Sequence, residues 1–154
     1  MNEQLDDATE ELKRADHLIF VSLKYTRTVD VFISIFERMI NFMGFVLDAF
    51  LQKGLDEQRM DNIPVSPMLK CEKVNELYPD EAIKKFTEFY IFLRKVLRSD
   101  YDKAREFRRH VTMTSYYEKD KSMDITTDLI GEWFDYMKEI STMAREKIEG
   151  EDAS

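Results

Sequence analysis

Arg105 and His110, with four residues between them, have the residue types and the spacing that catalysis at a phosphate would use. Histidine exchanges a proton near neutral pH, and the fork of an arginine stabilises the extra negative charge of a pentacoordinate phosphate. The pair therefore predicts cleavage of RNA without a metal, with the histidine taking the proton of a ribose 2′ hydroxyl or protonating the leaving 5′ oxygen. Because one histidine does not easily do both, we expect a twofold dimer in which two copies of the pair share one cleft.

The segment around this pair is basic, although the whole chain has a net charge of −8. Residues 94–109 contain seven Lys and Arg against three Asp and Glu, a local charge of +4. A cationic segment in an acidic protein favours a specific contact with RNA or a nucleotide over general binding of polyanions. The candidate phosphate-binding residues are Arg94, Arg98, Arg108 and Arg109. In the alternative interpretation, these arginines pair with acidic side chains on neighbouring helices.

The composition of the 154 residues excludes several protein classes. The hydrophobic fraction of 44% is enough for one continuous core, so we expect a single domain over residues 1–154 rather than a disordered regulator. The lone cysteine, Cys71, allows no internal disulfide, which favours the cytoplasm. The acidic first dozen residues do not resemble a signal peptide. The most apolar run, residues 40–51, is shorter than the roughly 20 residues of a membrane span, so no membrane association is expected.

Apolar residues recur at helical spacing from residue 16 to residue 51 and predict the central helix of a bundle. A continuous helix from residue 3 to residue 51 would be about 75 Å long, which exceeds a compact domain of this size. We expect a break within residues 25–29, where Thr28 can cap a new helix. Gly44 offers an alternative break.

The remaining segments also favour helices, because 4 Gly and 3 Pro leave few residues for the turns of a β-protein. An apolar stripe continues past Ser99 and Asp100 to Ala104, Phe107 and Val111, which places Phe107 on a buried helix face. The predicted fold is all-α, an antiparallel bundle of four to five helices. The other predicted segments are a loop at 55–67, a short helix at 68–77, an irregular connector at 113–123, a last helix ending at Gly150, and a frayed tail at 151–154.

Other polar residues give weaker signals. Arg27 and Asp30 interrupt the apolar pattern of the long helix, and we interpret them as residues that support the catalytic pair. His17 is interpreted as a cap or surface histidine. Neither histidine has an acid three residues before it, as a di-iron bundle requires, so we expect no metal and no cofactor.

The motif from Arg105 to His110 resembles the Arg-x(4 to 6)-His motif of the HEPN family. The resemblance implies a dimeric four- or five-helix bundle with Arg105 and His110 near the dimer cleft, and metal-independent ribonuclease activity. Many members are toxins paired with a nucleotidyltransferase antitoxin. Two positions depart from the pattern: Glu106 stands where active members commonly have a small polar residue, and Thr112 where some toxins have a tyrosine.

Two function hypotheses follow. The first is a HEPN-like RNA-binding protein or ribonuclease with a composite site at a dimer cleft. The second is a noncatalytic helical interaction module that pairs with itself or with another protein, because fold alone does not imply function. In both, we expect a homodimer, since the long helix carries apolar residues around more than half its circumference. A protein partner such as an antitoxin belongs to the first hypothesis.

Overall fold

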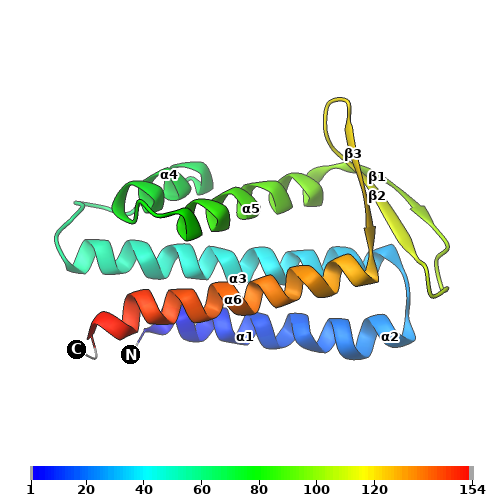
Figure 1. The fold of residues 1–154 in the computed structure, drawn as a ribbon, viewed down its shortest axis with the longest axis horizontal. Helices are drawn as coiled ribbons and strands as arrows, with labels where there is room; N and C mark the ends of the chain where they lie inside the picture. Colours follow the sequence, from blue (N-terminus) through cyan, green and yellow to red (C-terminus); the bar gives the residue numbers. More distant parts are fainter. Residues whose placement is uncertain (1, 153–154) are drawn as a thin grey trace.

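The computed structural model describes residues 2–152, which form a helical bundle with a small antiparallel sheet at one end (Figure 1). The helix α1 (Glu3–His17) continues through a π-helical turn (Leu18–Ser22) into α2 (Leu23–Tyr25). The remaining elements, in chain order, are α3 (Val29–Asp56), α4 (Pro67–Leu77), α5 (Glu81–Arg98), β1 (Asp100–Ala104), β2 (Thr112–Glu118), β3 (Lys121–Thr126) and α6 (Thr127–Asp152).

The long first helical segment breaks where Thr28 predicts it. Thr28 is extended and its hydroxyl accepts a hydrogen bond from the backbone N–H of Val31, which caps α3. Asp30 lies in the first turn of α3, where a negative charge is favourable. The prediction of a break within residues 25–29 is confirmed, and α3 runs through Gly44 without interruption.

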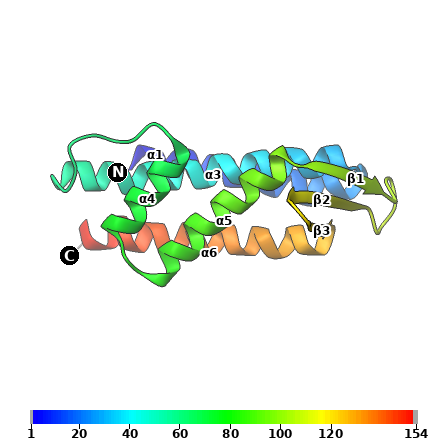
Figure 2. The same ribbon diagram turned by 90° about the horizontal axis from the view of Figure 1, so that it is seen from above.

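The helix α3 forms the centre of the bundle (Figure 1). It packs against α1, α4, α5 and α6, and α5 crosses obliquely over it in the second view (Figure 2). Its large apolar side chains, among them Phe32, Phe36, Met43 and Phe50, are fully buried within one chain. The other helices of the same chain therefore cover most of the apolar surface of α3, so its apolar pattern does not by itself require a second copy of the chain.

The prediction of an all-α fold is wrong, because three strands form an antiparallel sheet in the order β1-β2-β3. Lys103 pairs with Met113 across the first hairpin, and Met113 pairs with Ile125 across the second. The fold is therefore α+β. The scarcity of glycine is not an obstacle to the turns, since Arg105, Phe107 and Asp120 take up the left-handed backbone conformation that glycine usually supplies.

The alternating burial of β2 identifies it as a strand with one face on the core. Met113 and Ser115 are buried, whereas their neighbours Thr112 and Thr114 are half-buried on the opposite face. This period of two, in a segment rich in Thr and Tyr, is typical of a strand. The interpretation of residues 113–123 as an irregular connector is therefore wrong.

The helix α5 is shorter than its apolar stripe predicts. Arg98 ends it, Ser99 is extended, and the chain enters β1 at Asp100. Ala104 and Phe107 consequently lie outside the helix, and Phe107 is 75% exposed rather than buried. The apolar residues after Ser99 match a helical period in the sequence, but in the structure they belong to a β-hairpin.

The other boundaries lie within a few residues of the expected ones. The loop between α3 and α4 covers residues 57–66 instead of 55–67. Asp80 precedes the first residue of α5 and caps the helix, because its carboxylate accepts a hydrogen bond from the Ile83 N–H. The helix α6 extends past Gly150 to Asp152, and the rest of the expected tail, residues 153–154, lies outside the described residues.

Candidate nucleic-acid interface

The connection between β1 and β2 covers residues 105–111, and we call its residues 105–110 the hairpin tip. It contains both residues of the Arg-x(4)-His motif, and it lies at the end of the molecule where α2 meets α3 (Figure 1). Arg105, Phe107, Arg108, Arg109 and His110 are all exposed. The motif is therefore presented by a β-hairpin rather than by a helix.

Three contacts anchor the hairpin tip to the bundle. The backbone N–H of Phe107 donates to the carbonyl oxygen of Arg27 at 2.6 Å. The carboxylate of Glu106 accepts from the backbone N–H of Val29 at 3.1 Å, at the start of α3. Val111, directly after the tip, is fully buried in the core. The tip is thus fixed to the helical break that precedes α3.

The backbone of the hairpin tip is strained at two positions. Arg105 has a φ of 57° and Phe107 a φ of 65°, in the left-handed region that favours glycine. Each such residue costs of the order of 1–3 kcal/mol, and surrounding contacts must hold it there. The hydrogen bonds of Glu106 and Phe107 to the start of α3 supply such contacts. Strain of this kind is frequent where side chains are held for binding.

Six of the basic side chains of residues 94–109, together with His110, fall into two groups. Lys95 pairs with Glu118 at 2.8 Å, Lys103 with Glu106 at 3.6 Å, and the Arg94 guanidinium lies 5.6 Å from the centre of the Tyr90 ring. In contrast, the side chains of Arg105, Arg108, Arg109 and His110 make no hydrogen bond or ion pair within residues 2–152. Glu118 belongs to β2 and Glu106 to the hairpin tip, so neither lysine pairs with an acid of a neighbouring helix. Within residues 2–152, the alternative interpretation, in which the arginines pair with acids on neighbouring helices, therefore applies to none of the five arginines of residues 94–109.

The candidate phosphate-binding residues do not form one surface. Arg108 and Arg109 belong to the hairpin tip, whereas Arg98 is exposed in the last turn of α5, at the far end of β1. Arg94 lies one turn earlier in α5, over the ring of the buried Tyr90. Burial raises the pKa of the Cys71 thiol to about 11, an effect that the positive charge of Arg94 partly opposes. Arg94 therefore faces the packing of α4 on α5 rather than the tip.

The two residues expected to support the catalytic pair lie next to the hairpin tip. Arg27 provides the carbonyl oxygen that holds Phe107, so it acts through its backbone. Asp30 is exposed and follows Val29, whose N–H binds Glu106. Asp30 lies on α3, as the sequence pattern predicts, whereas Arg27 lies in the break before that helix, where its backbone anchors the tip.

Two exposed aromatic residues were missed by the sequence analysis. Phe107 is 75% exposed, and Tyr25, two residues before Arg27, is 80% exposed. Both match a helical apolar pattern, so no feature of the sequence indicates that their rings face solvent. Exposed aromatic rings beside unpaired arginines are typical of surfaces that bind single-stranded nucleic acids, because bases stack on the rings.

The chemistry available at the tip is that of an arginine and a histidine. Within the part of the chain that the structure describes, no three His, Cys, Asp or Glu side chains are grouped so as to hold a metal ion. An arginine can bind a phosphate oxygen through two parallel hydrogen bonds, and a histidine can donate or accept a proton. One chain supplies one such pair to the site.

Comparisons with protein-family models, with curated proteins and with solved structures found no match to this chain. No helix in residues 2–152 has the length and apolar character needed to cross a membrane.

Proposed function

We propose that this protein binds single-stranded RNA through the hairpin tip. The observation that carries the proposal is the set of unpaired basic side chains on a strained and anchored loop. Arg105, Arg108, Arg109 and His110 have no partner within the described residues, and Phe107 is exposed among them. A loop that is held rigid loses little conformational entropy when it binds.

Charge distribution supports a local contact. The chain as a whole carries −8, so its remaining surface repels a polyanion and directs it to the few basic regions. The acid within the tip, Glu106, is partly neutralised by Lys103 and faces the start of α3. The arginines on either side are consequently free to contact phosphates.

The exposed aromatic rings near the hairpin tip favour single-stranded over double-stranded RNA as the ligand. Stacking of a base on an aromatic ring contributes about 1–3 kcal/mol and requires an unpaired base. Phe107 and Tyr25 offer such rings at the same end of the molecule, near the Arg27 carbonyl that binds the tip. A double helix presents no free base face to them.

RNA cleavage is the catalytic extension of this proposal. The arginine stabilises the charge that develops on the phosphate, and the histidine moves the proton. A second copy of the chain would supply the second histidine if two tips meet on one strand. In the HEPN-like interpretation, a nucleotidyltransferase antitoxin would be the partner that controls such an activity.

The test measures the binding of a fluorescein-labelled single-stranded RNA by fluorescence anisotropy at several salt concentrations. The variant Arg108→Glu/Arg109→Glu should weaken binding at least about ten-fold at low salt and reduce the slope of log K against log salt by roughly 1.4. The matched control is Lys84→Glu/Lys119→Glu, which makes the same charge change at exposed lysines of α5 and of the β2–β3 turn.

Equal losses of RNA affinity in the two double variants would show that the net charge of the protein, and not the position of Arg108 and Arg109, determines binding. Absence of salt-sensitive RNA binding by the wild type would instead favour the noncatalytic interaction module.

A further inference from the structure

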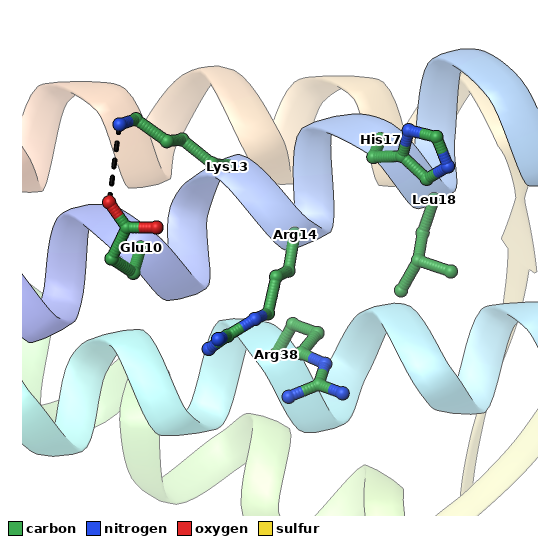
Figure 3. A pocket seen from close by; sticks show the side chains of 6 residues that line it. All are labelled: Glu10, Lys13, Arg14, His17, Leu18 and Arg38. Carbon is green, nitrogen blue, oxygen red and sulfur yellow. Dashed lines mark hydrogen bonds and ion pairs between the residues drawn. The ribbon is translucent and has the colours of Figure 1, made fainter.

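A second cationic region lies away from the hairpin tip, in a surface pocket between α1 and α3 (Figure 3). The pocket has a volume of about 330 Å³. Its lining comprises Glu10, Lys13, Arg14, His17, Leu18 and Arg38. Three of these six side chains are permanent cations, in a chain whose net charge is −8.

Two arginines from different helices share one buried carboxylate at this pocket. Arg14 Nη1 lies 2.9 Å from Glu11 Oε1, and Arg38 Nη1 lies 3.3 Å from Glu11 Oε2. The side chain of Glu11 is only 9% exposed, and each of its two carboxylate oxygens pairs with one of the two guanidinium groups. Figure 3 shows the ends of Arg14 and Arg38 close together between the two helices.

The charge of this trio is unbalanced. Glu11 supplies one negative charge to two guanidinium groups, and residues 2–152 provide no other ion pair to Arg14 or Arg38. Each guanidinium has five N–H donors, and its bond to Glu11 uses Nη1 alone. Further donors are therefore free on both arginines, and one positive charge is uncompensated.

The face of α1 adds two more groups to the same pocket. Lys13 and His17 are four residues apart and so project from the same side of the helix. Glu10 is the remaining acid in the lining, and Lys13 pairs with it at 3.2 Å. The arginines are thus left as the donors available to an anion.

We propose that the pocket between α1 and α3 is a binding site for the phosphate group of a small phosphate monoester. A phosphate has three terminal oxygens with strong acceptor capacity, and two arginine forks approaching from two helices can engage it together. A volume of about 330 Å³ is at the lower end of the range of small-ligand pockets, which leaves room for a small organic group beside Leu18. This site is independent of RNA binding at the hairpin tip.

Glu11 limits the affinity of this site, because its carboxylate competes with the ligand for the same guanidinium groups. Its replacement by the neutral Gln frees both arginines while keeping the shape of the side chain. A trio that serves only to join α1 to α3 would lose stability in this variant and gain no anion binding. The effect of Glu11→Gln thus separates a binding site from a structural ion-pair network.

The experiment is isothermal titration calorimetry of the full chain with inorganic phosphate and with ribose 5-phosphate. Arg14→Gln and Arg38→Gln should each weaken binding at least about ten-fold, and Glu11→Gln should strengthen it several-fold. The matched control, Arg145→Gln, removes an arginine that contacts Thr9 of α1 outside the pocket, and should leave binding unchanged. Circular dichroism establishes that each variant is folded.

A further titration distinguishes a free monoester from the backbone phosphate of RNA. A single-stranded oligonucleotide without terminal phosphates should bind through the hairpin tip and should be insensitive to Arg38→Gln. Failure of both phosphate ligands to bind the wild type at millimolar concentration would overturn the proposal, as would an equal loss in Arg145→Gln. Weakened phosphate binding in Glu11→Gln would also overturn it, whatever the outcome at the tip.

Discussion

The carboxylate of Glu106 accepts a hydrogen bond from the backbone N–H of Val29, which joins the hairpin tip to the first residue of α3. An anion at a helix N-terminus satisfies a free donor and interacts favourably with the helix dipole. The same residue departs from the HEPN pattern, in which a small polar residue is common. Its negative charge is thus used within the fold, and it positions the arginines on either side.

We predict that Glu106→Ala destabilises the protein and weakens RNA binding. Loss of a cap costs about 0.5–2 kcal/mol, and the tip loses one of its anchors. Urea denaturation and RNA anisotropy measure the two effects, with Glu37→Ala, an exposed acid of α3, as the control for charge. An increase in RNA affinity similar to that of Glu37→Ala would show that Glu106 acts only as a repelling charge.

We predict that Arg105→Gly and Phe107→Gly stabilise the fold, by roughly 1 kcal/mol each, while weakening RNA binding. Glycine adopts the left-handed backbone of these two positions without the steric cost of a side chain. Arg108→Gly provides the matched control, because Arg108 is not among the residues with positive φ and should gain no stability. Thermal unfolding of the three variants tests the prediction, and a loss of stability in the first two would contradict it.

Phe107→Ala should change the free energy of unfolding by less than about 0.5 kcal/mol, because the ring is 75% exposed. Phe36→Ala, in the fully buried centre of α3, should cost about 3–5 kcal/mol. Chemical denaturation of both variants makes the comparison. Similar losses in the two would mean that Phe107 is covered in solution, for instance by a second chain.

If the protein cleaves RNA, His110→Ala should reduce the rate by about 10²–10⁴-fold, since the proton transfer is lost. Arg105→Lys should keep most of the RNA affinity and lose turnover, because lysine retains the charge but not the fork. Cleavage of the labelled RNA under single-turnover conditions measures the rate, and anisotropy measures the affinity. Parallel changes in affinity and rate would assign Arg105 to binding alone.

Asp80 should make the stability depend on pH in the acid range. Burial by itself raises the pKa of Asp80, but hydrogen bonds from Lys147 and from the Ile83 N–H outweigh it, so the pKa lies below its ordinary value. Because folding lowers the pKa of Asp80, its stabilising effect is fully present at pH values above the pKa that Asp80 has in the unfolded chain. The effect is lost as the pH falls through the lower pKa of the folded chain.

Asp80→Asn keeps a capping side chain but removes the charge that faces Lys147. Its melting temperature should be below that of the wild type near pH 7, and the difference should shrink below about pH 4. A difference that is constant with pH would contradict the assignment.

Local chemistry determined the helical part of this fold. Thr28 caps α3 because its hydroxyl reaches an N–H three residues along the chain, an interaction that depends on neighbouring residues alone. The apolar period of residues 29–51 likewise predicts a buried central helix, and Phe36 and Met43 lie in its core. Such features are encoded over a few turns and need no knowledge of the rest of the chain.

Tertiary structure alone decided the sheet and the environment of the candidate site. The sequence placed Val111 at the end of a helical stripe and Met113 in an irregular connector, and only the pairing of Met113 with Lys103 and Ile125 forms the strand. Phe107 is exposed because Arg27 and Val29, distant in sequence, hold the tip by backbone hydrogen bonds. Arg14 and Arg38 meet on Glu11 only because α1 packs on α3. Contacts between residues far apart in the chain leave no periodic pattern in the sequence, so these features required the folded structure.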